Sequence, residues 1–219
     1  MTPAPWTAVL FDLDGTIVDS APGITDGFRH TLGHLGLPIP EDDALRDLIG
    51  PPILDSFRDT FGLSHEQAEG ALAIYRPHYL RTGLFNATVF PGIEQVLARV
   101  HESGLPTSLA TSKPESSATR VLVHFGLDKY FTVITGASES EERSAKADVV
   151  ADALRRLTAL GVDLSNPVMV GDRDHDINGA AANGIPTIIV DWGYGRPGED
   201  TGAVAVVSTA RELEALLLG

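Results

Sequence analysis

The sequence predicts an α/β fold in which a doubly wound, mostly parallel sheet carries an inserted, all-helical subdomain. Short runs of apolar and β-branched residues alternate with segments of helical periodicity. This alternation is typical of a parallel sheet that helices cover on both faces. One long interval has helical periodicity only, and an interval of that length is too long for an ordinary connection between a strand and a helix.

The predicted strands are continuous apolar runs, without the alternation of a strand that has one face in water. They cover residues 7–11, 106–111, 131–135, 168–170, 187–190 and 204–207. The predicted helices between them cover residues 92–103, 115–125, 144–160 and 176–183. We therefore expect a strand and a helix to follow one another through most of the chain.

The interval from residue 20 to residue 82 has no convincing strand and several helix breakers, among them Gly36, Pro38 and Gly50. We expect it to form a separate helical unit. The predicted organisation is an α/β core of residues 1–17 and 88–219, with a helical insertion of residues 18–87.

Composition limits the classes of function. The chain has 219 residues, 30 acidic and 16 basic, with a net charge of −14 and no cysteine. Because the chain has no run of basic residues, we do not expect it to bind a nucleic acid polymer. It could still bind a small anion at one point. Disulfides, thiolate metal sites and a cysteine nucleophile are excluded. We find no signal peptide or apolar run of membrane-spanning length, and we expect a cytoplasmic protein that does not bind membranes.

Two carboxylates follow the first predicted strand, where Asp12 and Asp14 flank Leu13 and precede Gly15. One interpretation is a turn in which solvated acids cap the end of a strand. The other is catalytic, with one carboxylate attacking a phosphoryl group while its neighbour transfers a proton. An anionic nucleophile that approaches an anionic group needs a divalent cation, so this interpretation implies a metal.

Hydroxyl and cationic residues follow the next two strands. Thr111 and Ser112 precede a predicted helix, where they would hold phosphate oxygens or satisfy only local backbone groups. Ser144 is a suitable N-cap, which puts Lys146 in the first helical turn, where the helix dipole disfavours a cation. Since the chain has thirteen Arg and three Lys, this lysine indicates either a bound anion or a solvated surface position.

A further acidic group follows the strand at residues 168–170. Asp172 and Asp176 are four residues apart, so one helical turn would place them on the same side. Carboxylate oxygens suit Mg²⁺, although acids at a helix N-terminus are also favoured by the helix dipole alone.

Two other patterns do not support a cofactor site. Gly193–Gly198 matches G-x-G-x-x-G, but Pro197 interrupts it and no helix is predicted after it, so we reject a dinucleotide site. His30 and His34 have helical spacing without a third ligand, and we interpret them as ordinary residues of a helix face.

Together, the motifs that contain Asp12-Leu13-Asp14-Gly15-Thr16, Thr111, Lys146 and Gly171–Asp176 resemble those of the haloacid dehalogenase superfamily. The resemblance covers essentially the whole chain and is greatest to the phosphoglycolate phosphatase-like branch, which includes 5′-nucleotidases and carries a helical cap. It implies that Asp12 is the nucleophile and Asp14 the general acid and base. Thr111 and Lys146 would bind the phosphate, with Lys146 also a brace for Asp12, and Ser112 beside Thr111 is a further candidate for phosphate binding. Mg²⁺ would be held by Asp12, the main-chain carbonyl of Asp14 and Asp172, with Asp176 in support.

The expected function is therefore that of a Mg²⁺-dependent phosphatase that hydrolyses a small-molecule phosphate monoester, phosphoglycolate-like or a nucleoside monophosphate, through an aspartyl phosphate. Two alternatives remain, a β-phosphoglucomutase-like mutase and a non-catalytic binding protein of the same fold. For substrate specificity the candidates in the cap are Arg46 and Gly50. The sequence does not determine the substrate or the oligomeric state.

Overall fold

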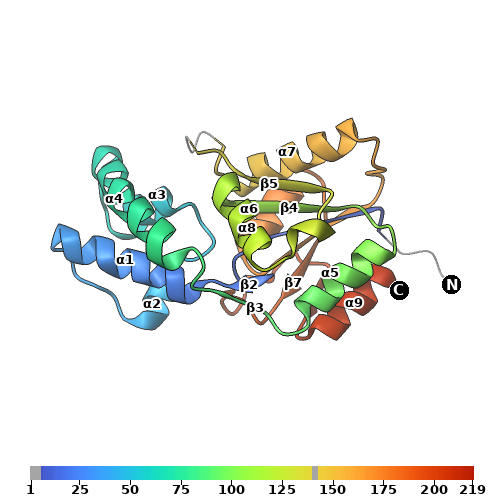
Figure 1. Cartoon of the computed structure of the whole chain (residues 1–219), viewed down its shortest axis with the longest axis horizontal. Coiled ribbons are helices and arrows are strands. Elements are labelled where there is room, and N and C mark those ends of the chain that lie inside the picture. The colour runs from blue at the N-terminus through green and yellow to red at the C-terminus, as the bar shows by residue number, and fades with distance from the viewer. Residues whose placement is uncertain (1–5, 140–142) are drawn as a thin grey trace.

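The computed structural model describes residues 6–139 and 143–219. Figure 1 shows two parts, an α/β core and a group of helices at its side, which the chain joins through a short pair of strands. In the described part of the chain, no helix is both long enough and apolar enough to span a membrane.

The core contains a parallel sheet, as predicted. Its order in the described residues is β5-β4-β1-β6-β7-β8, and each neighbouring pair is parallel. The strands are β1 (Ala8–Phe11), β4 (Thr107–Pro114), β5 (Val133–Ala137), β6 (Pro167–Gly171), β7 (Thr187–Val190) and β8 (Ala205–Val207). The chain builds outward from β1 first through β4 to β5, and then on the other side from β6 to β8. The strand order therefore reverses beside β1, and in such sheets ligands bind at the carboxyl ends of the strands at this point.

Helices cover both faces of the sheet because the side chains of each strand alternate between them. Val9 and Phe11 of β1 pack into the cluster on one face, whereas Ala8 and Leu10 pack into the cluster on the other. The first face is covered by α5 (Ile93–Glu102), α6 (Glu115–His124) and α9 (Ala210–Leu218), the second by α7 (Lys146–Ala159) and α8 (Asp174–Ala181), and a short turn η3 (Asp128–Tyr130) precedes β5. The fold class predicted from the sequence is thus confirmed.

The helical part, called the cap below, follows β1 in the chain. Its elements are α1 (Ala21–Leu35), α2 (Asp42–Arg46), α3 (Ile53–Asp55), the π-helical turn η1 (Ser56–Thr60), α4 (His65–His78) and the π-helical turn η2 (Tyr79–Gly83). Phe28, Phe57 and Tyr75 form its aromatic centre, with ring centroids 5.2–6.2 Å apart. Gly23 allows α1 to approach η2, because a Cβ there would lie 2.1 Å from the carbonyl oxygen of Gly83.

A two-stranded antiparallel ribbon joins the cap to the core and was not predicted. It consists of β2 (Val18–Asp19) and β3 (Thr88–Val89). Two residues per strand are too few to produce a recognisable hydrophobic pattern, and their pairing joins segments far apart in the sequence. The boundaries at residues 17 and 88 stay a prediction, and residues 1–5 of the predicted core lie outside the described residues.

Candidate active site

The strand ends that the sequence analysis singled out converge at the carboxyl edge of the sheet. Asp12 directly follows β1 and Asp172 directly follows β6, the strand that pairs with it. Lys146 begins α7 and reaches Asp12 across 134 residues of sequence, with its Nζ donating to Asp12 Oδ1 at 2.7 Å. The structure therefore brings these three residues into one cluster.

Lys146 is buried and holds several groups at once. Its Nζ also lies 2.7 Å from Asp176 Oδ1 and donates to the carbonyl oxygen of Ala110 at 3.1 Å. Burial alone would lower the pKa of this lysine, but the carboxylates of Asp12 and Asp176 raise it above its usual range. Lys146 is thus buried against two carboxylates, and the alternative of a solvated surface lysine is wrong. Gly179 makes room for it, since a Cβ there would lie 2.4 Å from Lys146 Cγ.

The start of α7 differs from the prediction in one respect. Ala145, not Ser144, is the N-cap residue, and no side chain caps this helix. Ala145 already has extended backbone angles, φ −62° and ψ 137°. Lys146 is consequently the first helical residue, and it lies in the first turn as expected.

Asp12, Asp172 and Asp176 form a buried acidic cluster whose ligand oxygens lie within 4.8 Å of one another. Burial, together with the neighbouring Asp176, raises the pKa of Asp12 to about 6 despite the opposing effect of Lys146. Burial and repulsion from the charge of Asp176 raise the pKa of Asp172 well above its usual range. Three clustered carboxyl groups that repel one another in their ionised form would be stabilised by a divalent cation, and carboxylate oxygens are the donors that suit Mg²⁺.

Backbone contacts hold the two later acids in place. Asp176 Oδ2 accepts hydrogen bonds from the backbone N–H groups of Asp172 and Arg173 at 3.0 and 3.1 Å. The helix α8 begins at Asp174, two residues before the predicted start, so Asp176 lies in its first turn. Gly171 is required here, because a Cβ would lie 2.2 Å from the carboxylate carbon of Asp176.

The glycine-rich loop after β7 supports this site, a role the sequence analysis did not find. The backbone N–H of Tyr194 donates to Asp172 Oδ2 at 2.7 Å. The Tyr194 hydroxyl donates to Asp19 Oδ1 and accepts from the N–H groups of Ser20 and Ala21. A Cβ on Gly193 would lie 2.4 Å from Asp172. The glycines thus allow a close approach to an acidic residue and not to a dinucleotide.

Asp14 has a partner that the sequence analysis did not assign. Lys113 Nζ donates to both carboxylate oxygens of Asp14, at 2.9 and 2.8 Å, and both side chains are buried. Asp14 is not part of the acidic cluster, so a metal contact through its main-chain carbonyl stays a prediction. The signal in the sequence was the rarity of lysine, because Lys113 and Lys146 are two of three lysines and both occupy this site.

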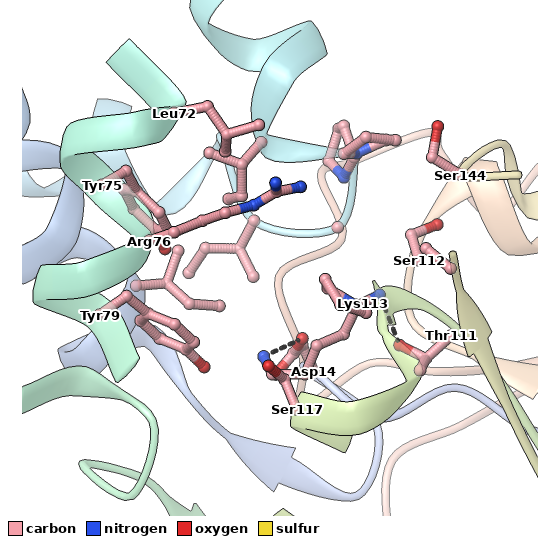
Figure 2. Close-up of a pocket in the computed structure, with 18 of the residues that line it drawn as sticks. Asp14, Leu72, Tyr75, Arg76, Tyr79, Thr111, Ser112, Lys113, Ser117 and Ser144 are labelled. Carbon is pink, nitrogen blue, oxygen red and sulfur yellow. Dashed lines mark hydrogen bonds and ion pairs between the residues drawn. The ribbon is translucent and has the colours of Figure 1, made fainter. Parts of the chain in front are cut away.

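A cavity opens above these residues, between the core and the cap. Its empty volume is about 990 Å³, including space open to solvent, and Asp12, Asp14, Thr111 and Ser112 contribute to its core wall. Figure 2 shows Thr111 and Ser112 on that wall near Lys113. The Thr111 hydroxyl accepts a hydrogen bond from the Lys113 N–H at 3.3 Å. The positions suit phosphate binding, but that role stays a prediction.

The two cap residues proposed for specificity occupy different environments. Gly50 lines the cavity, with a positive φ of 117° that other residues rarely adopt. Arg46 is exposed at the end of α2 and is not among the described residues that line the cavity, because that short helix turns its neighbour Leu45 inward. The structure therefore does not place Arg46 where it could contact a substrate.

Arg173 connects the loop around Gly50 to the core. Its side chain is buried and donates to the carbonyl oxygen of Ile49 at 2.6 Å. The same guanidinium binds Glu199 through two hydrogen bonds of 2.7 and 3.1 Å. Arg173, the residue after Asp172, thus holds the cap loop that faces the cavity.

His30 and His34 belong to the cap helix α1, as expected, and lie outside the cavity lining. His30 stacks on His78 at a centroid distance of 3.8 Å, and His78 Nε2 lies 2.7 Å from Asp26 Oδ2. Among the described residues they do not form a group of three metal ligands.

Comparison with known proteins agrees with this geometry. A model of the family described as haloacid dehalogenase-like hydrolase matches residues 9–190. The chain is 48% identical over 188 residues to the tyrosine-protein kinase PtkA of Mycobacterium tuberculosis, which covers 86% of this chain and 63% of that protein. The chain thus spans less than two thirds of that relative.

Two other relatives are matched over most of their length. The 5′-nucleotidase of Pseudomonas aeruginosa is 36% identical over 87% of this chain and 85% of its own. The plasmid phosphoglycolate phosphatase of Cupriavidus necator is 34% identical over 97% and 94%. Among solved structures, a predicted phosphatase from Clostridium acetobutylicum has a TM-score of 0.90 and 34% identity, with 96% of this chain and 97% of that one covered. The resemblance inferred from the motifs is confirmed.

Proposed function

Because the chain belongs to the haloacid dehalogenase-like hydrolases, we propose that it is a Mg²⁺-dependent phosphatase of small-molecule phosphate monoesters that forms an aspartyl phosphate on Asp12. The observation that carries this proposal is the cluster of Asp12, Lys146, Asp172 and Asp176. It combines a buried candidate nucleophile, a lysine that holds it, and three clustered carboxyl groups that offer oxygen ligands.

In the first step, a carboxylate oxygen of Asp12 attacks phosphorus and the bond to the leaving oxygen breaks. Asp14 protonates that oxygen, so the alcohol leaves neutral. Lys146 holds Asp12 in position and offsets its charge as the phosphoryl group approaches. Thr111 and Ser112 bind the phosphoryl oxygens from the core wall.

In the second step, water attacks the phosphorus of the acyl phosphate and Asp14 takes its proton. The bond between phosphorus and Asp12 breaks, which releases inorganic phosphate and restores the carboxylate. Mg²⁺, held by Asp12 and Asp172 with Asp176 in support, would neutralise the charge that accumulates on the phosphoryl oxygens.

The first test is phosphate release from a panel of phosphate monoesters in the presence of Mg²⁺. Asp12→Asn keeps the size of the side chain and removes the nucleophile, so kcat should fall by at least about a thousandfold for every ester. Circular dichroism and thermal melting would show that the variant is folded. Substantial turnover by folded Asp12→Asn would refute the role of Asp12.

The same panel separates the alternatives. Conversion of β-glucose 1-phosphate to its isomer, without free phosphate, would indicate a mutase. No turnover of any ester would indicate a non-catalytic protein.

Transfer to a protein hydroxyl is a second candidate, favoured by the 48% identity to a protein named a tyrosine kinase. In that case Asp14 would take the proton of an attacking tyrosine. Incubation with γ-labelled ATP and a tyrosine-containing protein would distinguish the two functions. Label on the protein would support transfer, and label only in inorganic phosphate would support hydrolysis.

A further inference from the structure

The chain enters the cap through a short connection. The strand β2 ends at Asp19, and the first cap helix, α1, begins two residues later at Ala21. Figure 1 shows this junction beside the ribbon that joins the cap to the core. The position of the cap over the cavity therefore depends on what holds the start of α1.

The start of α1 is capped by a residue of the core. The first N–H groups of a helix have no acceptor within the helix, and the side chain of the N-cap residue usually supplies one. In the described part of the chain, the side chain of the N-cap residue Ser20 caps no backbone N–H. Instead, the N–H groups of Ser20 and Ala21 donate to the hydroxyl of Tyr194, at 2.8 and 3.0 Å.

The hydroxyl of Tyr194 also binds the ribbon. A phenolic oxygen can accept two hydrogen bonds and donate one. Here the two accepted bonds come from the start of α1, and the donated bond goes to Asp19 Oδ1 at 2.9 Å. The same oxygen of Asp19 accepts a hydrogen bond from the N–H of Ala21 at 3.2 Å. One hydroxyl therefore connects the end of β2 with the start of α1.

The backbone of Tyr194 binds a residue of the active site. Its N–H donates to Asp172 Oδ2 at 2.7 Å. The neighbouring glycines permit this approach, because a Cβ on Gly193 would lie 2.4 Å from the Cβ of Asp172, and a Cβ on Gly195 would lie 2.4 Å from its carbonyl oxygen. A tyrosine side chain has only two rotatable torsions. Tyr194 is therefore a short, stiff link between Asp172 and the start of α1.

Trp192 holds the same loop against both connections to the cap. Its indole N–H donates to the carbonyl oxygen of Thr16, just before β2, at 3.2 Å. Its ring lies 6.5 Å from that of Phe90, just after β3. The N–H of Phe90 in turn donates to the carbonyl oxygen of Ile17 at 3.0 Å. A change in this loop would therefore reach both chain segments that carry the cap.

Asp172 is one of the residues expected to hold Mg²⁺, so a metal that fixes its carboxylate would also fix the loop that holds α1. From these contacts, and resting on the proposed function, we propose that Tyr194 is a positioning residue that couples the metal site to the cap. It acts through Asp172 and α1, and it is not among the described residues that line the cavity. Mg²⁺ at Asp172 thereby stabilises the observed position of the cap.

The test measures amide hydrogen exchange of the whole chain with and without Mg²⁺, because exchange reports local opening. In the wild type, Mg²⁺ should slow exchange several-fold in peptides that cover residues 168–180 and also in peptides that cover residues 18–28. Tyr194→Phe removes the hydroxyl and keeps the backbone N–H that binds Asp172. In this variant the slowing should remain at residues 168–180 and be lost at residues 18–28.

Enzyme kinetics give a second readout on a short ester, phosphoglycolate, and a ring-bearing ester, phenyl phosphate. Tyr194→Phe should lower kcat/KM about tenfold, the effect expected from loss of hydrogen bonds that include one to a carboxylate. The factor should be the same for both esters, because Tyr194 is outside the described cavity lining. Tyr130→Phe is the matched control, since Tyr130 lies in η3 before β5, at the opposite edge of the sheet. It should behave as the wild type.

The outcomes separate this inference from the proposed function. If Mg²⁺ slows exchange at residues 168–180 of the wild type but not at residues 18–28, the coupling is overturned and the metal site stands. This comparison needs no variant, so it decides even if Tyr194→Phe does not fold. Equal slowing at residues 18–28 in the wild type and Tyr194→Phe, or an unchanged kcat/KM, would overturn the role of Tyr194. If Mg²⁺ slows neither segment and no ester is hydrolysed, the proposed function fails and this inference fails with it.

Discussion

The two walls of the cavity are built on different principles. On the core wall, Asp12 and Asp14 line the cavity and each forms a buried ion pair, Asp14 with Lys113 and Asp12 with Lys146, which is not itself among the described lining residues. The cap wall, formed by the cap residues that line the cavity, consists mainly of aromatic and aliphatic side chains such as Leu72, Tyr75 and Tyr79. The core wall suits the phosphoryl group, which every phosphate ester shares, and the cap wall suits the leaving group, in which the esters differ.

The walls also differ in how they are held. The core residues follow strands that hydrogen bonds tie together in one sheet. The cap residues lie on helices that join the core through the ribbon of β2 and β3 and through Arg173. Changes in the core wall should therefore reduce turnover of all esters by one factor, whereas changes in the cap wall should alter the ratios between esters.

Among the changes to the core wall, removal of the metal should reduce turnover the most. Chelation should abolish turnover of every ester, and Mg²⁺ should restore it, because the excess charge of the acidic cluster is then uncompensated. Phosphate release with and without chelator measures this. Full activity in excess chelator would contradict the proposed metal site.

The same cluster predicts a pH dependence of stability. Burial and Asp176 raise the pKa of folded Asp12 to about 6, above its unfolded value of 3.8, so without metal the carboxyl destabilises the fold progressively as the pH rises from about 4 to about 6. Bound Mg²⁺ offsets this and competes with the proton. The gain in Tm from Mg²⁺ should therefore be larger at about pH 7.5 than at about pH 5. An equal gain in Tm at the two pH values would contradict this prediction. Asp172→Asn should reduce the gain in Tm that Mg²⁺ gives.

Loss of Lys113 should have the next largest effect. Lys113→Met removes the cation that holds both oxygens of Asp14, so kcat should fall on the order of a hundredfold, with little change in KM. Lys113→Arg should recover part of this. Steady-state kinetics on a short ester and a ring-bearing ester check whether both fall equally. Lys129→Met, which removes an exposed lysine, is the control.

A smaller effect is expected at the connection between the walls. Arg173→Lys loses the two-fold contact with Glu199 and the bond to Ile49, so the loop around Gly50 loses its anchor. KM for ring-bearing esters should rise several-fold, and KM for short esters should change less. Arg99→Lys, at an exposed ion pair with Glu102 of the same core helix, should leave both values nearly unchanged. An equal rise for all esters would contradict the division between the walls.

Much of the core half was predictable from the sequence. The apolar run of β7 was placed at its observed residues, 187–190, and the acids after β1 and β6 were expected at one edge of the sheet. These features are local, since continuous apolar runs indicate buried parallel strands and the carboxyl ends of parallel strands share an edge. The pairing of Lys146 with Asp12 was implied only by the resemblance to a family.

The remaining features depended on contacts that no local pattern records. Lys113 and Asp14 are separated by 99 residues, and Tyr194 meets Asp172 through its backbone, which carries no residue-specific signal. Arg46 and Arg76 both lie on cap helices, and only the packing of those helices decides that Arg76 lines the cavity. The sequence by itself determined the fold class, because that follows from residue periodicity, and it indicated which polar residues follow the strands. The tertiary structure alone decided which charges pair and which helix face lines the cavity, because both depend on long-range packing.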